Sequence, residues 1–218
     1  MRETIITLRR LLAGETVDFG GSRSHLAFAT GQPVPLLLAG RGPRILELAG
    51  EVADGVFPYV GLHRANIDYV LEQVARGAAS DGRDPRALEY VWDIHMALAP
   101  TRQEALAAAR STCAYWLAQP SLAALLRRAG LDAPDPLHAT SWREAQRLAP
   151  SLSNETVAGI GEVIGAYGPP TFVAETLSSA IKLGVGKVYV RPGEGEALPV
   201  ATLRAFRDVI FARLAQNS

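Results

Sequence analysis

The sequence is poor in cysteine and lysine and has no excess of either charge. A single cysteine, Cys113, among 218 residues excludes an internal disulfide and any metal site built from several thiolates. The 22 Lys and Arg residues balance the 22 Asp and Glu residues, so the net charge indicates no nucleic-acid or membrane-surface partner. Only Lys182 and Lys187 are lysines, and the other cations are arginines, whose planar forks suit phosphate groups.

Long apolar runs are missing as well. No stretch reaches the roughly 18 apolar residues that a transmembrane helix needs, and residues 1–4 do not begin a signal peptide. We therefore expect a cytoplasmic protein with no membrane partner. Hydrophobic residues make up 48% of the chain and charged residues 20%, which is typical of a globular domain and excludes intrinsic disorder.

Helical and strand patterns alternate along the chain, which predicts parallel α/β structure. A glycine turn indicates a short hairpin, with strands at 17–19 and 25–28. Continuous apolar runs predict buried strands over 35–39, 53–59, 88–98 and 187–191. Apolar residues at helical spacing predict helices over 3–13, 45–52, 66–79, 101–116, 154–166, 172–183 and 199–215, with shorter helical pieces between 119 and 151.

The turn after the strand at 35–39 has the physical features of a phosphate site. The sequence Gly40 to Arg44 ends the strand, and a helix begins at once. Gly40 and Gly42 allow the backbone to approach a ligand, and Pro43 suits the first helical position because no N–H is needed there. The helix then presents free N–H groups and its positive dipole end, to which two arginines add charge. The alternative is a tight strand-to-helix turn whose arginines lie in solvent.

Three stretches of the chain resemble the luciferase-like monooxygenase superfamily. Residues 33–56 (PVPLLLAGRGPRILELAGEVADGV) are most similar to its F-420-dependent branch, which includes methylenetetrahydromethanopterin reductase. Residues 6–19 resemble the helix and hairpin before that segment, and residues 168–190 resemble the closing helix–strand unit. The resemblance implies a TIM-type (β/α)8 barrel, of which residues 1–218 supply the C-terminal part as one partial domain of about four strand–helix units. The helical pieces at about 119–152 are then an insertion.

The resemblance also implies a cofactor and its contacts. The cofactor is coenzyme F-420 (F420, an 8-hydroxy-5-deazaflavin), with FMN as the alternative. The expected cofactor-binding residues lie in two loops, one holding the cofactor phosphate and one lining the cofactor: Ala39, Gly40, Arg41, Gly42, Pro43 and Arg44, then Pro58, Gly61 and Leu62. No catalytic residue is assigned, because most residues that face the redox ring in this family belong to the absent first half of the barrel.

The implied function is hydride transfer between the deazaflavin and a small organic substrate. The alternative is a non-catalytic, truncated cofactor-binding or subunit-like remnant. An open half-barrel would expose strand edges and the inner faces of its strands, so we expect a homodimer or completion by another chain.

Individual candidates each have two interpretations. Asp54 is either a site carboxylate or a partner for nearby backbone N–H groups. His95, on the strand face that it shares with Val91 and Asp93, is either a proton donor or cofactor contact, or a hydrogen-bonded core histidine. Arg191, at the end of the last strand, points toward the functional rim of a barrel, where it could bind substrate or a cofactor tail.

Other patterns carry less chemistry. Cys113 lies in an alanine-rich helix and is expected to be a buried, inert thiol. No two of the four histidines have helical metal-ligand spacing, so no metal is expected. The series Gly159, Gly161 and Gly165 imitates part of a dinucleotide fingerprint, but it lies within a predicted helix and does not follow a strand.

Overall fold

The computed structural model describes residues 1–132, 139, 141–192 and 199–216. The chain forms two compact units: Met1–Pro58 with Val70–Val91, and Tyr59–Tyr69 with the residues from Trp92 onward. Helix α3 (Arg64–Ser80) and strand β5 (Glu89–Leu98) each contribute residues to both units.

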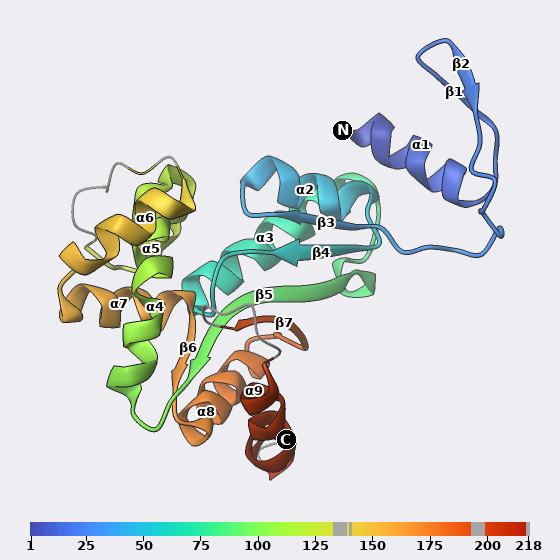
Figure 1. The fold of residues 1–218 in the computed structure, drawn as a ribbon. Helices are drawn as coiled ribbons and strands as arrows, with labels where there is room; N and C mark the ends of the chain where they lie inside the picture. Colours follow the sequence, from blue (N-terminus) through green and yellow to red (C-terminus); the bar gives the residue numbers. More distant parts are fainter. Residues whose placement is uncertain (133–138, 140, 193–198, 217–218) are drawn as a thin grey trace. The chain divides into compact units, whose positions relative to one another are not determined.

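The first unit is a small parallel sheet with helices packed beside it (Figure 1). The register of β3 on β4 pairs Leu37 with Gly55, and the register of β4 on β5 pairs Gly55 with Glu89. N-terminal to this sheet in the sequence, α1 and an antiparallel hairpin form an arm that is drawn in blue. The elements of this unit besides α3 and β5 are α1 (Arg2–Leu12), β1 (Val17–Phe19), β2 (Ser22–Ser24), β3 (Leu37–Gly40), α2 (Pro43–Val52), β4 (Gly55–Pro58) and the 3-10 turn Pro85–Ala87.

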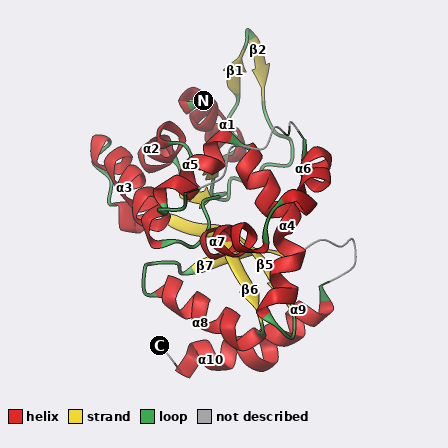
Figure 2. Ribbon diagram, turned by 90° about the vertical axis from the view of Figure 1, so that its left-hand side faces the viewer, coloured by secondary structure: helices red, strands yellow, loops and turns green. Residues whose placement is uncertain are grey.

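The second unit surrounds the remainder of β5 with helices (Figure 2). Strand β6 runs parallel to β5, pairing Gly165 with His95, and β7 also pairs with β5. Helices α8 and α10 pack on each other. The elements of this unit are α4 (Arg102–Ala118), α5 (Pro120–Arg128), α6 (Trp142–Leu148), the 3-10 turn Ala149–Ser151, α7 (Asn154–Ile164), β6 (Gly165–Gly168), α8 (Pro170–Ile181), β7 (Lys187–Pro192), α9 (Val200–Ala205), the π-helical turn Phe206–Ile210 and α10 (Phe211–Gln216).

The prediction of an α/β fold with a parallel sheet is confirmed, but the described residues close no barrel. Apart from the β1–β2 hairpin, their strands form one sheet in the order β3-β4-β5-β6, with β7 on β5. The region 119–152 is helical where it is described, in α5 and α6. Helix α4 begins with a capping box, since the Thr101 side chain accepts from the Glu104 N–H and the Glu104 side chain accepts from the Thr101 N–H.

Three predicted details are wrong. The predicted helix 154–166 ends at Ile164, because residues 165–168 form strand β6. A Cβ on Gly165 would lie 2.0 Å from the carbonyl oxygen of His95, so this backbone approach requires glycine. The second hairpin strand is 22–24 and not 25–28. The helix predicted over 172–183 begins two residues earlier, at Pro170, as α8.

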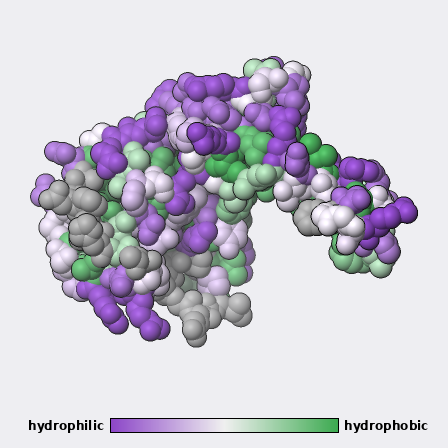
Figure 3. Space-filling view, turned by 90° about the horizontal axis from the view of Figure 1, so that it is seen from above, coloured by the Kyte–Doolittle hydropathy of each residue, from purple (hydrophilic) through white to green (hydrophobic). Residues whose placement is uncertain are grey.

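The strand predicted at 35–39 is not buried on both faces. Strand β3 pairs only with β4 among the described residues, so it lies at an edge of the sheet. Leu37 and Leu38 are half-buried, and Ala39 is exposed. Earlier in the same unit, Phe28 and Val34 are 74% and 48% exposed. Figure 3 shows hydrophobic residues on the surface where the N-terminal arm joins the rest of the first unit.

Two glycines allow α2 and α3 to touch through their backbones. A Cβ on Gly50 would lie 2.1 Å from the carbonyl oxygen of Val74, and one on Gly77 would lie 1.9 Å from that of Glu47. Both contacts are with backbone atoms, which cannot rotate away as a flexible side chain could. The two helices must therefore separate to accept any side chain at these positions.

We predict that Gly77→Ala destabilises the protein by about 2–3 kcal/mol, as overpacked cores do. The control is Gly186→Ala, because a Cβ on Gly186 meets no atom within 4 Å and should change stability by less than about 0.5 kcal/mol. Urea unfolding of both variants measures the difference. Equal stability of the two variants would contradict the close helix contact.

Candidate functional site

The turn between β3 and α2 forms an electropositive helix end. Helix α2 begins at Pro43, and Gly42 is its N-cap with extended backbone (φ −79°, ψ 153°). Helix geometry leaves the N–H groups of Arg44 and Ile45 without an acceptor inside the helix. No acidic residue lies in the first turn. Arg44 is exposed and Arg41 is half-buried, so both local charge and backbone donors favour an anion at this end.

The two glycines of this turn have different structural reasons. A Cβ on Gly40 would lie 2.4 Å from Cγ2 of Ile45, so Gly40 is explained by packing against the helix that follows. A Cβ on Gly42 would meet no atom within 4 Å, so the space above Gly42 is open. Gly40 is also the register partner of Pro58, so these two predicted site residues lie side by side at the carboxyl ends of β3 and β4.

The other two predicted cofactor residues, Gly61 and Leu62, are buried against α7. Gly61 has a φ of +77°, and a Cβ there would lie 2.1 Å from the carbonyl oxygen of Val163. The Leu62 N–H donates to that same oxygen over 3.0 Å. These contacts fix the loop after β4 on α7. That the nine predicted residues contact a cofactor stays a prediction.

Asp54 is a local structural carboxylate. Its Oδ2 accepts the Leu36 N–H at 2.8 Å, and its Oδ1 accepts from Nη1 of Arg9 at 2.8 Å. Partial burial opposes ionisation, but the hydrogen bonds from Arg9 and Leu36 outweigh it and hold the pKa of this carboxyl below its ordinary value. The interpretation of Asp54 as a partner for nearby N–H groups is therefore confirmed.

The two faces of β5 differ chemically. Trp92, Ile94 and Met96 are at most 1% exposed and form part of the apolar core. The alternate residues Asp93 and His95 share the opposite face, on which His95 is partly exposed. Polar side chains from other elements gather on this face of the second unit.

Tyr59 links His95 to α4. The phenol oxygen of Tyr59 lies 2.6 Å from Nε2 of His95, and Nε1 of Trp116 donates to that oxygen at 3.0 Å. The Tyr59 ring centroid lies 5.5 Å from that of His95 and 5.4 Å from that of Trp116. Sequence reasoning found His95 but missed Tyr59 and Trp116. The available sequence signal was the pair of aromatic residues at alternate positions, Phe57 and Tyr59, and in the structure both are partly exposed while Pro58 is buried.

Arg191 forms a two-point salt bridge with Asp93. Its Nε donates to Oδ1 at 2.7 Å and its Nη2 donates to Oδ2 at 2.6 Å. The Asp93 side chain is 1% exposed and that of Arg191 50%, so a buried carboxylate is compensated by a cation that reaches solvent. The guanidinium carbon also lies 5.3 Å from the Tyr59 ring centroid. That Arg191 binds substrate or a cofactor tail stays a prediction. The structure shows that Arg191 also pairs with Asp93.

Burial sets the protonation of the cluster. It lowers the pKa of His95 to about 4, with help from the positive charge of Arg191. Burial also raises the pKa of Tyr59 to about 12. At neutral pH the pair is therefore a neutral imidazole hydrogen-bonded to a neutral phenol.

Cys113 is buried, as predicted, and its Sγ lies 3.8 Å from the carbonyl oxygen of Val157. Burial raises the pKa of this thiol to about 12, so it is inert at neutral pH. Among the described residues, no three His, Cys, Asp or Glu side chains are close enough together to hold a metal. His138 lies outside the described residues.

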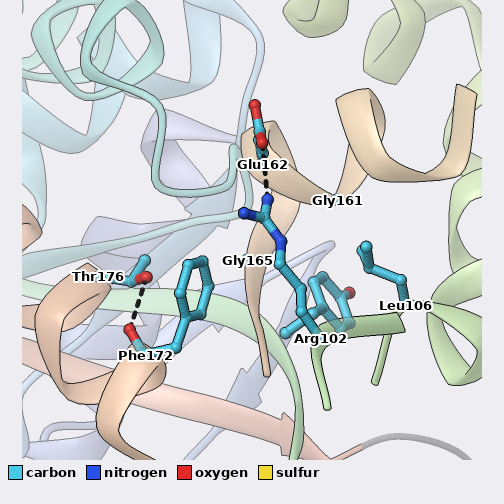
Figure 4. Close-up of a pocket in the computed structure, with 8 residues that line it drawn as sticks. Arg102, Leu106, Gly161, Glu162, Gly165, Phe172 and Thr176 are labelled. Atoms are coloured by element: carbon cyan, nitrogen blue, oxygen red, sulfur yellow. Dashed lines mark hydrogen bonds and ion pairs between the residues drawn. The ribbon is translucent and has the colours of Figure 1, made fainter. Parts of the chain in front are cut away.

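A small cavity lies where α4, α7, β6 and α8 meet (Figure 4). Its volume of about 90 Å³ is below the range for drug-sized ligands. Arg102 crosses it, donating from Nη2 to Glu162 at 2.6 Å while its guanidinium lies 4.6 Å from the Phe172 ring centroid. Because its charged groups satisfy each other and it is small, this cavity is not a deazaflavin site.

Comparison with known proteins identifies the family. The family model described as luciferase-like monooxygenase matches residues 1–187. The chain belongs to the luciferase-like monooxygenase family. This luciferase-like chain is 34% identical over 139 residues to 5,10-methylenetetrahydromethanopterin reductase of Methanolobus tindarius, covering 60% of this chain and 41% of the relative. It is 31% identical over 163 residues to F420-dependent glucose-6-phosphate dehydrogenase of Beutenbergia cavernae, covering 72% and 44%.

Solved structures show the same fold. The coenzyme F420-dependent tetrahydromethanopterin reductase of Methanopyrus kandleri matches with a TM-score of 0.71 at 17% identity, over 98% of this chain and 62% of that one. An F420-dependent secondary alcohol dehydrogenase, solved with an F420–acetone adduct, matches with a TM-score of 0.67 at 18% identity, over 97% and 60%.

This luciferase-like chain spans about half the length of the curated relatives it matches, between 41% and 58%. The described part of the chain contains no helix that is both long enough and apolar enough to span a bilayer.

We predict that His95 makes stability depend on pH. Its folded pKa of about 4 lies below the unfolded value of 6.5, so the unfolded chain binds the proton more tightly. The stabilisation is fully present above pH 6.5 and is lost as pH falls toward 4, by up to about 3 kcal/mol.

Urea unfolding of the wild type and of His95→Gln across this range measures the effect. The difference in stability between the two proteins should shrink as pH falls, because Gln does not titrate. A difference independent of pH would contradict a buried neutral His95.

Proposed function

We propose that this chain is the cofactor-binding part of an F420-dependent oxidoreductase that transfers hydride between the deazaflavin and a small organic substrate. The observation that carries the proposal is the open, positively charged start of α2, in a chain of the luciferase-like family. Several of its relatives and structural neighbours are F420-dependent by name.

The residues at the start of α2 fit a phosphate group. Gly42 leaves open space, the N–H groups of Arg44 and Ile45 point out of the helix end, and no carboxylate in the first turn competes. Arg41 and Arg44 supply positive charge. These groups would hold the cofactor phosphate through charge-assisted hydrogen bonds.

When bound, the deazaflavin supplies the hydride chemistry. The protein's part is to bind and orient it. The rigid β3–α2 turn, fixed by the packing of Ile45 on Gly40, would hold the phosphate at one position relative to the ends of β3 and β4. Such positioning raises the reaction rate, because a hydride donor and acceptor that are held together react as a unimolecular pair.

Fluorescence titration of the purified chain with F420 tests the proposal. We predict saturable binding that is weakened about tenfold by Arg41→Ala and by Arg44→Ala, because each removes a charged partner of the phosphate. The matched control is Arg86→Ala, which removes an exposed arginine of the same unit that pairs with Asp84. A parallel titration with FMN separates the two cofactor candidates.

Binding of F420 that is equally strong in all four proteins would contradict the assignment of the phosphate to this turn. Tighter binding of FMN than of F420 would mean that the cofactor is a flavin and not a deazaflavin. If a folded sample binds neither cofactor, the truncated-remnant alternative replaces the enzyme.

We also propose that the chain associates with a second copy through the first unit. The edge strand β3 and the exposed side chains of Phe28 and Val34 support this, because exposed strand edges and apolar side chains favour pairing. Sedimentation at increasing protein concentration should show a dimer that Val34→Lys weakens. A monomer over the whole concentration range would contradict the proposal.

A further inference from the structure

The hydrogen bonds that join Trp116, Tyr59 and His95 bear on which nitrogen of His95 carries its proton. An indole N–H can only donate, so Trp116 gives its hydrogen to the Tyr59 oxygen. A phenol both accepts and donates. The Tyr59 hydroxyl can then donate to Nε2 of His95, 2.6 Å away, so that both hydrogen bonds run in the same direction. In the neutral imidazole the proton then lies on Nδ1.

Two N–H donors on this face remain without a partner among the described residues. None of those residues bonds Nδ1 of His95, because the hydrogen bond between His95 and Tyr59 uses Nε2. The Arg191 guanidinium uses Nε and Nη2 for Asp93, and no described residue accepts from its Nη1. Both groups contact the same phenol ring, the imidazole centroid at 5.5 Å and the guanidinium carbon at 5.3 Å. Asp93 and His95 share one face of β5, and Arg191 pairs with Asp93 and acts on His95 through its charge, so both donor groups lie on this face.

We propose that Nδ1–H of His95 and Nη1–H of Arg191 together bind the carbonyl oxygen of a small neutral substrate, with Tyr59 and Trp116 as positioning residues that set the tautomer of His95. The neutral charge of the expected ligand follows from the site. Asp93 neutralises Arg191 and His95 is uncharged, so the donors carry no net charge that would favour a carboxylate. A carbonyl oxygen has two lone pairs and accepts both hydrogen bonds.

This inference rests on the proposed function only for the reaction that the bound carbonyl would undergo. Hydrogen bonds to its oxygen polarise the carbonyl and stabilise the negative charge that develops there when hydride adds to carbon. The tautomer and the binding of the carbonyl compound belong to the second unit and can be measured without any cofactor.

The first measurement is the tautomer of His95. Nitrogen-15 NMR of the histidine side chains at neutral pH, assigned by the loss of one signal in His95→Gln, should show a protonated Nδ1 and an unprotonated Nε2. Tyr59→Phe removes the hydroxyl donor and should shift the population toward protonated Nε2. A wild-type His95 that is protonated on Nε2 would overturn the inference.

The second measurement uses two probes of nearly equal shape, acetone and acetate. Acetone should shift the His95 Nδ1 resonances in a saturable manner, and acetate at the same concentrations should not. Arg191→Lys keeps a cation beside Asp93 but removes Nη1, and should weaken the effect of acetone about tenfold. His95→Asn retains an N–H near the Nδ1 position and should retain weak binding of acetone, whereas His95→Gln should lose it.

The outcomes separate this inference from the proposed function. In a sample that binds F420, acetone could leave the His95 resonances unchanged up to the concentration at which the chain unfolds. That result overturns the inference and leaves the proposed function in place. Acetone binding in a chain that binds no F420 supports the inference while the proposed function fails. Acetate that binds as well as acetone overturns the assignment to a neutral carbonyl.

Discussion

The alternation of side chains along β5 is the constraint on which the structure of the second unit depends. Every second residue, Trp92, Ile94 and Met96, is buried in the apolar core. The residues between them must then face the other way, which places Asp93 and His95 together. A shift of register by one residue would bury His95 in the core and expose Trp92. The core contacts of one face therefore hold the polar cluster of the other face in position.

Helix starts that are marked by a few neighbouring residues were predictable from sequence. The start of α2 follows from Pro43 after a glycine, and the start of α4 follows from Thr101 with Glu104 three residues on. Strand β6 was not predictable in this way. Its four residues, Gly165–Gly168, follow an apolar helical pattern directly, and only the approach of Gly165 to the backbone of His95 explains its extended conformation.

The residues of the candidate site also differ in whether the local sequence could reveal them. The glycine–arginine turn before α2 is one continuous segment, so its residues could be named from sequence and resemblance. The polar cluster depends on contacts between distant residues, since Tyr59 is 36 positions from His95 and Asp93 is 98 positions from Arg191. No periodicity in one segment reports such pairs. Sequence reasoning therefore found His95 and Arg191 singly but could not assemble them with Tyr59 and Trp116.

The two parts of the chain contribute different chemistry. The first unit offers charge and backbone donors at a helix end, which suits an anionic group. The second offers hydrogen-bond donors without net charge, held by the salt bridge between Arg191 and the buried Asp93 and by a phenol, which suits an uncharged oxygen. In the proposed function both arrangements bind and orient, and the cofactor supplies the redox chemistry.

The central claim is that the start of α2 holds the phosphate of a deazaflavin cofactor. A crystal structure of this chain grown with F420 tests it most directly. We expect a phosphate oxygen within hydrogen-bond distance of the N–H groups of Arg44 and Ile45. A cofactor phosphate bound elsewhere on the chain, with this helix end occupied by water alone, would contradict it.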